Sequence, residues 1–211
     1  MRATARLLGA LLVAAAVAVP AAAQAPRQTA VLAGGCFWGM QEVFEHVDGV
    51  TRVISGYSGG TAATATDEQV NTETTGHAES VEITFDPAVV SYATLLDVFF
   101  RVAHDPTQLD RQGPDAGKSY RSVIFYADAA QHREAEAAIA RLTAARVYAG
   151  RIVTEVVPLH GFYRAAAYHQ DYAVRHPDDP YIVDNDLPKV RRLREVFPRL
   201  YREAPVLASS R

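Results

Sequence analysis

The fold is decided by the stretch over residues 29–44, which reads TAVLAGGCFWGMQEVF. Its first five residues form a short apolar run, which predicts a buried strand, and two glycines then end that run. Apolar side chains follow at helical spacing at Phe37, Met40, Val43 and Phe44. This spacing predicts a helix that begins near Cys36. The stretch therefore predicts a strand that passes directly into a helix, with a cysteine at the junction.

The rest of the chain alternates strand and helix patterns, separated by two long polar loops. We expect strands over 51–55, 81–85, 123–126 and 152–157, and helices over 92–102, 129–145 and 164–175. The glycine-rich stretch 56–60 indicates a turn, the loops cover 61–78 and 104–119, and the tail after residue 184 is amphipathic. Helices and a mainly antiparallel sheet in two layers fit this order. We therefore predict one α+β domain, a two-layer sandwich with long loops, over residues 24–211.

The composition narrows the class of protein. The chain has 211 residues, of which 49% are apolar and 21% are charged, and this balance is typical of a soluble globular protein. The formal net charge is -3, which argues against a nucleic-acid partner, because such proteins normally carry a basic face. It also gives no electrostatic reason to expect an anionic membrane partner.

The first 23 residues have the three-part pattern of a secretory signal. Arg2 and Arg6 form a short positive region, residues 7–19 are an apolar run, and Ala21–Ala23 supply a small-residue cleavage site. The apolar run is shorter than the roughly 20 residues that a spanning helix needs, although an uncleaved anchor is the alternative. We expect an exported protein, periplasmic or secreted, that is free of the membrane after cleavage.

Cys36 is the only cysteine of the chain, so no internal disulfide can form. A thiol at a helix N-terminus faces unpaired backbone N–H groups and the positive end of the helix dipole, which favour the thiolate and lower the pKa. The preceding glycines leave the sulfur approachable, and Phe37 and Trp38 would form an apolar patch beside it. The alternative is a small buried hydrophobic residue, a common fate of a free cysteine.

Three further residues are candidates for the site. Glu79 lies at the start of the strand around 81–85, where an apolar pocket would raise its pKa and make it a proton donor; a solvated edge carboxylate is the alternative. Asp115 and Tyr120, in the second polar loop, are candidates for oriented hydrogen bonds. The seven histidines are scattered, so we expect no metal site and no bound cofactor.

The run GCFWG at residues 35–39 closely resembles the signature of the A class of peptide methionine sulfoxide reductases. Further family blocks follow in the family's order: SGYSGG at 55–60, TGHAE at 75–79, HDPT at 104–107, RQGPD at 111–115, YRS at 120–122, YHQDY at 168–172 and NDLPK at 185–189. The resemblance extends from about Val31 to the tail. It implies a ferredoxin-like core and the reduction of methionine-(S)-sulfoxide, free or in proteins, as a repair of oxidised proteins.

The resemblance also assigns roles to the candidates. It implies that Cys36 attacks the sulfoxide sulfur and becomes a sulfenic acid, while Phe37 and Trp38 cradle the methyl group. A second set of groups acts on the sulfoxide oxygen, because the sulfur is a poor electrophile until that oxygen is hydrogen-bonded or protonated. By resemblance, Glu79 protonates the oxygen, Tyr120 hydrogen-bonds it and Asp115 supports the site.

Two departures from the family pattern stand out. Asp67 occupies a position where the family usually has a tyrosine, so one donor to the sulfoxide oxygen is missing, and restoring tyrosine would be expected to raise turnover. Many relatives carry a resolving cysteine near the C-terminus, and this chain has none. We therefore expect an external thiol reductant, either a thioredoxin-like protein or a small dithiol, acting on a monomer.

Two alternatives remain open at this point. A one-cysteine peroxidase would also form a sulfenic acid at Cys36, but by attacking a peroxide. A degenerate relative would bind oxidised methionine without turning it over, and Asp67 is the residue that favours this alternative. Comparing the turnover of methionine sulfoxide with that of hydrogen peroxide distinguishes a reductase from a peroxidase. Binding of methionine sulfoxide without formation of methionine would identify a degenerate relative.

Overall fold

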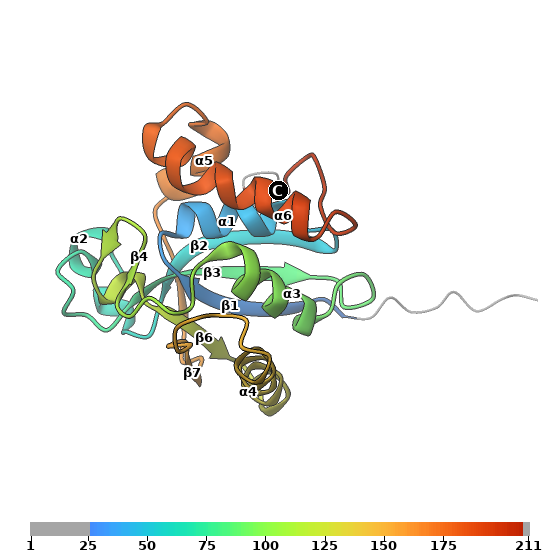
Figure 1. The fold of residues 1–211 in the computed structure, drawn as a ribbon. Coiled ribbons are helices and arrows are strands. Elements are labelled where there is room, and N and C mark those ends of the chain that lie inside the picture. The colour runs from blue at the N-terminus through green and yellow to red at the C-terminus, as the bar shows by residue number, and fades with distance from the viewer. Residues whose placement is uncertain (1–25, 209–211) are drawn as a thin grey trace, which may run out of the picture.

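The computed structural model describes residues 26–208, and a curled six-stranded sheet runs through its centre (Figure 1). The order across the sheet is β7-β6-β1-β3-β2-β8. The strands are β1 (Gln28–Gly34), β2 (Val50–Ser58), β3 (Ala78–Phe85), β6 (Ser122–Tyr126), β7 (Glu155–Pro158) and β8 (Phe162–Arg164). All neighbours pair antiparallel except β6 and β7, which are parallel. The predicted α+β class and mainly antiparallel sheet are therefore confirmed.

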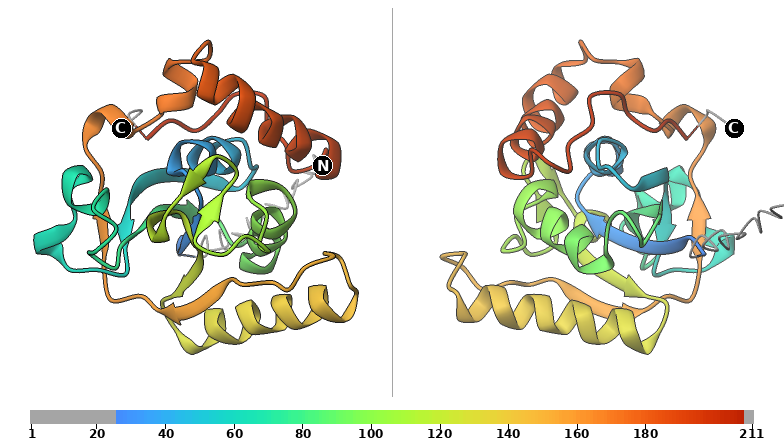
Figure 2. Two further views of the ribbon diagram at one scale, coloured as in Figure 1. Left: turned by 60° about the vertical axis from the view of Figure 1, so that its left-hand side comes forward. Right: turned by 90° about the vertical axis from the view of Figure 1, so that its right-hand side faces the viewer.

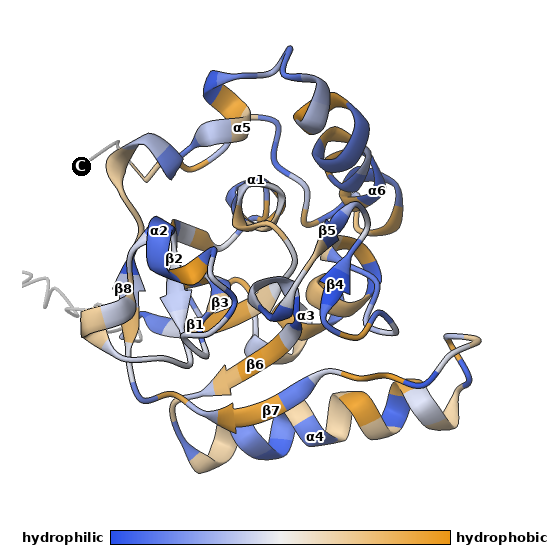
Figure 3. Cartoon of the chain, turned by 90° about the vertical axis from the view of Figure 1, so that its left-hand side faces the viewer, coloured by the Kyte–Doolittle hydropathy of each residue, from blue (hydrophilic) through white to orange (hydrophobic). Residues whose placement is uncertain are grey.

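Short helices and turns surround this sheet (Figure 2). The α-helices are α1 (Phe37–Glu45), α2 (Asp67–Val70), α3 (Tyr92–Val98), α4 (Ala129–Ala144), α5 (Tyr172–Arg175) and α6 (Leu187–Val196). A separate hairpin consists of β4 (Arg111–Gln112) and β5 (Asp115–Ala116), and η3 (Lys118–Tyr120) follows it. The predicted loop 104–119 is thus partly ordered as a hairpin, which brings its polar residues toward the N-terminal end of α1 (Figure 3).

The apolar core lies between the sheet and the helices. Ala30 and Leu32 of β1 join the main cluster together with buried residues of α1, α3 and α4. Val31 and Ala33 face the other side of the sheet, where Val157 and nearby residues cover them. Both faces of β1 are therefore buried, which explains why its sequence is a continuous apolar run rather than an alternating one.

Three segments differ from the sequence prediction, the first of them at residues 56–60. The stretch 56–60 was expected to be a turn, but β2 continues to Ser58, with Tyr57 paired to Glu79 of β3. Gly56 is required there because β8 lies so close that a Cβ atom would be 2.4 Å from the carbonyl oxygen of Tyr163. A glycine pattern that indicates a turn can equally mark a close approach of two strands.

The second difference concerns residues 164–175, which were predicted to form one helix. Instead, the segment begins as the end of β8, passes through the 3₁₀ turn η4 (Ala167–His169), and forms only the short α5. Asp171 has a φ of 54°, in the left-handed region, so a continuous α-helix cannot pass through this residue. The predicted strand at 152–157 is also shorter, because only Glu155–Pro158 pairs with β6.

The export signal predicted at residues 1–23 lies outside the described residues. Within residues 26–208, no helix combines the length and the apolar character needed to cross a bilayer.

Because Glu45 of α1 is buried, we expect the stability of the fold to depend on pH. Glu45 is fully buried, and burial, followed by the charge of Asp171, raises its pKa to about 10. The pKa of Glu45 is higher in the folded protein than in the unfolded chain. The contribution of the neutral carboxyl group to the free energy of unfolding is therefore fully present below about pH 4 and is lost as the pH rises toward 10. Glu45→Gln is expected to raise the melting temperature at pH 9, by roughly 2–4 °C per kcal/mol of stability gained, and to change it little at pH 4.

Thermal denaturation at the two pH values measures this effect. The matched control is Glu136→Gln on α4, whose side chain is 58% exposed and should leave both melting temperatures unchanged. An equal shift at pH 4 and pH 9 would show that the effect does not come from the ionisation of Glu45.

Candidate active site

Cys36 is the N-cap of α1, at the junction between β1 and the helix. Gly35 makes this junction possible, since its φ is +96° and a Cβ atom would lie 2.6 Å from the side chain of Gln112. On the other side, the ring of His104 leaves no room for a Cβ atom on Gly34. The two glycines therefore allow β1 to pass tightly beneath the second polar loop, and Cys36, at the start of α1, is only 7% exposed.

The pKa of Cys36 is raised well above its ordinary value, so the predicted lowering is wrong. Burial is the largest cause, and the negative charges of Glu79 and Asp186 add to it. The helix N-terminus acts in the predicted direction, because the backbone N–H of Trp38 donates to the sulfur, and Lys189 also favours the thiolate. These two contributions are smaller than the cost of burial, and the resting sulfur keeps its proton.

Glu79 lies close to Cys36, whose pKa its charge helps to raise. It is the second residue of β3, is 7% exposed, and accepts a hydrogen bond of 2.9 Å from the backbone N–H of Phe37 at the start of α1. Burial, aided by the charges of Asp115 and Asp67, raises its pKa to about 8 against the opposing hydrogen bond. The carboxyl group is therefore mostly protonated at neutral pH and is a proton donor next to the thiol.

The second polar loop brings Tyr120 and Asp115 to the same place. Burial and the nearby charges of Glu79, Asp115 and Cys36 raise the pKa of Tyr120, so its phenol remains a hydrogen-bond donor. The loop is held by Glu73, which accepts hydrogen bonds from the backbone N–H (2.9 Å) and the hydroxyl (2.6 Å) of Ser119.

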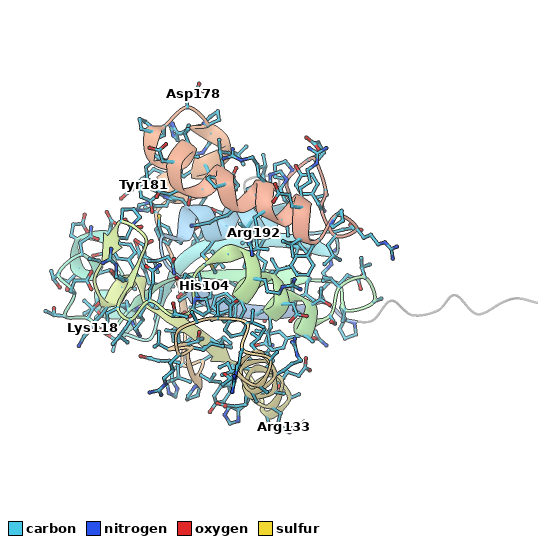
Figure 4. All side chains as sticks on the ribbon, in the orientation of Figure 1. His104, Lys118, Arg133, Asp178, Tyr181 and Arg192 are labelled. Atoms are coloured by element: carbon cyan, nitrogen blue, oxygen red, sulfur yellow. The ribbon has the colours of Figure 1, made fainter. Side chains whose placement is uncertain are left out.

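Tyr181 is a site residue that the sequence reasoning missed. Its hydroxyl donates to the Oδ2 of Asp115 at 2.5 Å, and its ring stands edge-on to Trp38. Burial, followed by the nearness of the ionisable sulfur of Cys36, raises the pKa of its phenol. Figure 4 places it on the segment that leads from α5 toward α6. No periodicity signals this role, because Tyr181 lies at the start of the π-helix η5 (Ile182–Asp186), which runs into α6 and which only the tertiary fold places against α1.

Asp186 and Lys189 were also missed. Asp186 is fully buried, and its carboxylate lies 3.0 Å from the ammonium group of Lys189. The pair occupies the space above Gly39 of α1, where a Cβ atom would be 2.0 Å from the Asp186 Oδ1. The second glycine of the GCFWG run was the available signal, since it marks a close approach to the helix, although it does not identify the partner.

The two aromatic residues that follow Cys36 have different surroundings. Phe37 is 1% exposed and packs against Tyr57 and His169 in the core. Trp38 is half-buried and stacks on Tyr172, with ring centroids 3.8 Å apart and planes 10° apart. The face of the site near the sulfur is therefore formed by Trp38 and Tyr181, with Phe37 beneath them.

The arrangement joins a buried thiol, a neutral carboxyl group and a phenol donor next to an aromatic wall. Such a site can polarise a neutral polar oxygen while the sulfur attacks the atom that carries it. Within residues 26–208, no group of three or more histidine, cysteine or carboxylate side chains is placed to hold a metal ion.

Comparisons with known proteins agree with this chemistry. The family model described as Peptide methionine sulfoxide reductase matches residues 28–199. The chain is 53% identical over 183 residues to a Mesorhizobium japonicum protein named Peptide methionine sulfoxide reductase MsrA 2, covering 87% of this chain and 94% of the relative. It is 47% identical to the Thermus thermophilus MsrA, covering 84% of this chain and 99% of that one.

Comparison with solved structures identifies the same family. The methionine sulfoxide reductase A of Corynebacterium diphtheriae matches with a TM-score of 0.64 and 34% identity, over 73% of this chain and 77% of that one. Reduced Mxr1 from Saccharomyces cerevisiae matches with a TM-score of 0.66 and 29% identity, over 72% of this chain and 87% of that one. The chain belongs to the peptide methionine sulfoxide reductase family and to its A class.

Proposed function

We propose that this reductase converts methionine-(S)-sulfoxide, free or in proteins, to methionine, with Cys36 as nucleophile and Glu79 as proton donor. The observation that carries the proposal is the meeting of the only thiol of the chain with a buried carboxyl group whose pKa is raised to about 8. Assignment to the A class supports the S epimer, and the half-buried Trp38 offers a surface for the methyl group.

The two ionisable groups are coupled in a direction that suits the reaction. The negative charge of Glu79 raises the pKa of Cys36, so a proton on Glu79 makes it easier for the sulfur to ionise. Glu79 and Tyr120 then donate to the sulfoxide oxygen, and the Cys36 sulfur forms a bond to the substrate sulfur. The oxygen then passes from the substrate sulfur to Cys36: the substrate S–O bond and the new bond between the two sulfurs break, and a bond from the oxygen to the Cys36 sulfur forms. The thiol proton of Cys36 replaces the proton that Glu79 gave to the oxygen. The sulfoxide is reduced by two electrons to methionine, which leaves, and Cys36 is oxidised by two electrons to a sulfenic acid.

The second half of the cycle requires a thiol from outside. Because Cys36 is the only cysteine, its sulfenic acid cannot condense within the chain. One external thiol displaces water to form a mixed disulfide with Cys36, and a second thiol releases Cys36 as the external disulfide forms. We infer a thioredoxin-like protein or a small dithiol as this reductant, and a monomer as the working unit, because all the groups named above come from one chain.

The place of action follows from the signal pattern of residues 1–23. We infer export to the periplasm or beyond, and repair of oxidised proteins there. Cell fractionation together with sequencing of the mature N-terminus tests this inference, and a full-length chain that remains in the cytoplasm would refute it.

A single-turnover experiment tests the proposed function. Without reductant, the pre-reduced protein should form about one methionine per chain from the S epimer and none from the R epimer, because the single Cys36 can be oxidised only once. Addition of a dithiol should then start continuous turnover, and a monothiol should trap a mixed disulfide at Cys36 that is visible by mass spectrometry.

The competing outcomes are distinct. Faster consumption of hydrogen peroxide than of methionine sulfoxide would favour a peroxidase. Binding of the sulfoxide without any methionine formed would indicate a degenerate relative. More than one methionine per chain without reductant would contradict the single-thiol cycle.

A further inference from the structure

Asp67 is the residue at which this chain departs from the family pattern, and its surroundings give it a role that the sequence did not suggest. We propose that Asp67 is a positioning residue, which fixes the ring of His169 and, through that ring, the indole of Trp38 in the substrate-binding wall. This inference rests on the proposed function, because Trp38 is taken as part of the surface that receives methionine sulfoxide.

The first link joins Trp38 to His169. The indole Nε1–H donates to the Nδ1 of His169 at 3.1 Å. That nitrogen must therefore carry a lone pair, so a neutral His169 holds its proton on Nε2. His169 is 5% exposed, and burial lowers its pKa, which keeps the imidazole neutral and preserves this tautomer.

The second link joins His169 to Asp67. The Nε2 of His169, which carries the proton, lies 3.3 Å from the Oδ1 of Asp67. This contact is a close approach of charge to dipole rather than an aligned hydrogen bond, but a carboxylate beside Nε2 and a donor at Nδ1 favour the same tautomer and ring orientation. A carboxylate, a histidine and a tryptophan thus follow one another from α2 to α1, although residues 67 and 169 are far apart in the sequence.

Asp67 is itself held firmly. Tyr57 donates its hydroxyl to Oδ1 at 3.3 Å, and Tyr168 donates to Oδ2 at 3.0 Å. The backbone at Asp67 is set by the start of α2, where the hydroxyl of Thr66 accepts a hydrogen bond from the backbone N–H of Gln69. Asp67 therefore accepts a hydrogen bond on each carboxylate oxygen, while its Oδ1 also lies close to the Nε2 of His169.

The stacking of Trp38 explains why this chain of contacts matters for binding. Tyr172 covers one face of the indole at 3.8 Å, and the ring of Tyr181 stands edge-on to it. Stacking alone leaves the indole free to slide in its plane, and the bond from Nε1 to His169 removes that freedom. Asp67 acts on the wall of the site through His169 rather than on the sulfoxide oxygen.

This geometry reverses the expectation drawn from the sequence for Asp67→Tyr. A tyrosine would bring one hydroxyl where two carboxylate oxygens now accept from Tyr57 and Tyr168, and it would remove the negative charge that lies beside the Nε2 of His169. We now expect that substitution to weaken binding of the sulfoxide instead of raising turnover.

The test uses Asp67→Asn, which keeps the size of the side chain but turns one acceptor into a donor. The control is Glu68→Gln, an exposed carboxylate at the next position of α2. Trp38 is the only tryptophan, so intrinsic fluorescence reports directly on the indole. We expect Asp67→Asn to shift the emission maximum, to make Trp38 more accessible to acrylamide, and to raise KM for the S epimer roughly 3- to 10-fold with kcat changed less than about twofold.

A second variant approaches the same link from the other end. Trp38→Phe keeps an aromatic ring without the N–H, so it should raise KM as well, and adding Asp67→Asn to it should cause no further increase. Unchanged emission and KM in folded Asp67→Asn, or full additivity of the two substitutions, would overturn the proposal. The fluorescence readout needs no turnover, so an inactive wild-type protein would refute the proposed function and leave the test of Asp67 intact.

Discussion

Replacement of Cys36 by serine is expected to reduce the turnover of methionine sulfoxide by roughly 10⁴-fold or more. The reaction transfers the substrate oxygen to the sulfur of Cys36, and a serine side chain, which has oxygen in place of that sulfur, cannot form a sulfenic acid. No other cysteine exists in the chain to substitute for it. Chromatographic separation of methionine from its sulfoxide measures the loss.

The protein should remain folded in this variant. Serine fits the space of cysteine, and the backbone N–H of Trp38, which donates to the sulfur, can donate to a hydroxyl oxygen equally well. The melting temperature should therefore change by only a few degrees, and a reagent selective for sulfenic acids should label the wild type after one turnover but not the variant. Substantial turnover by Cys36→Ser would mean that the reaction does not use a sulfur nucleophile.

Replacement of Glu79 by glutamine is the second large effect, with an expected loss in kcat/KM of roughly 10²–10³-fold. Glutamine still accepts the hydrogen bond from the Phe37 N–H and can donate a weak hydrogen bond, but it cannot deliver a proton to the sulfoxide oxygen. The loss should fall mainly on kcat, because the protonated oxygen is required in the transition state rather than for binding.

The pH profile distinguishes a proton donor from a merely structural carboxyl group. In the wild type, the pKa of Glu79 near 8 means that the donor form is present below pH 8 and is lost as the pH rises through it, so kcat/KM should decline on the alkaline side. The glutamine variant should lack that decline. Glu82→Gln is the matched control, since it lies on the same strand with its side chain on the opposite face. The same alkaline decline in Glu79→Gln would rule out Glu79 as its source.

The sequence alone determined the features that depend on local patterns. The apolar run at 29–33, the helical spacing after Cys36 and the alternation around 81–85 were sufficient for the strand-to-helix junction, the α+β class and most of the sheet. The sequence motifs, in their order along the chain, were enough to identify the family. The presence of a single cysteine was enough to predict that an external thiol must complete the cycle. Each of these depends on neighbouring residues or on composition, which folding does not change.

The tertiary structure decided everything that depends on which distant segments meet. The glycine-rich stretch 56–60 predicts a turn, but Gly56 marks the close approach of β8 to β2. The left-handed backbone conformation of Asp171 divides the segment that was predicted as one helix. The helix N-terminus predicts a lowered pKa for Cys36, yet burial, together with the negative charges of Glu79 and Asp186, raises it. Tyr181 lies 66 residues from its partner Asp115, and Tyr168 lies 101 residues from Asp67. Burial and the packing of remote elements, rather than periodicity, set the pKa values, the hydrogen-bond partners and the orientation of Trp38, because desolvation and contact energies exist only once the chain is folded.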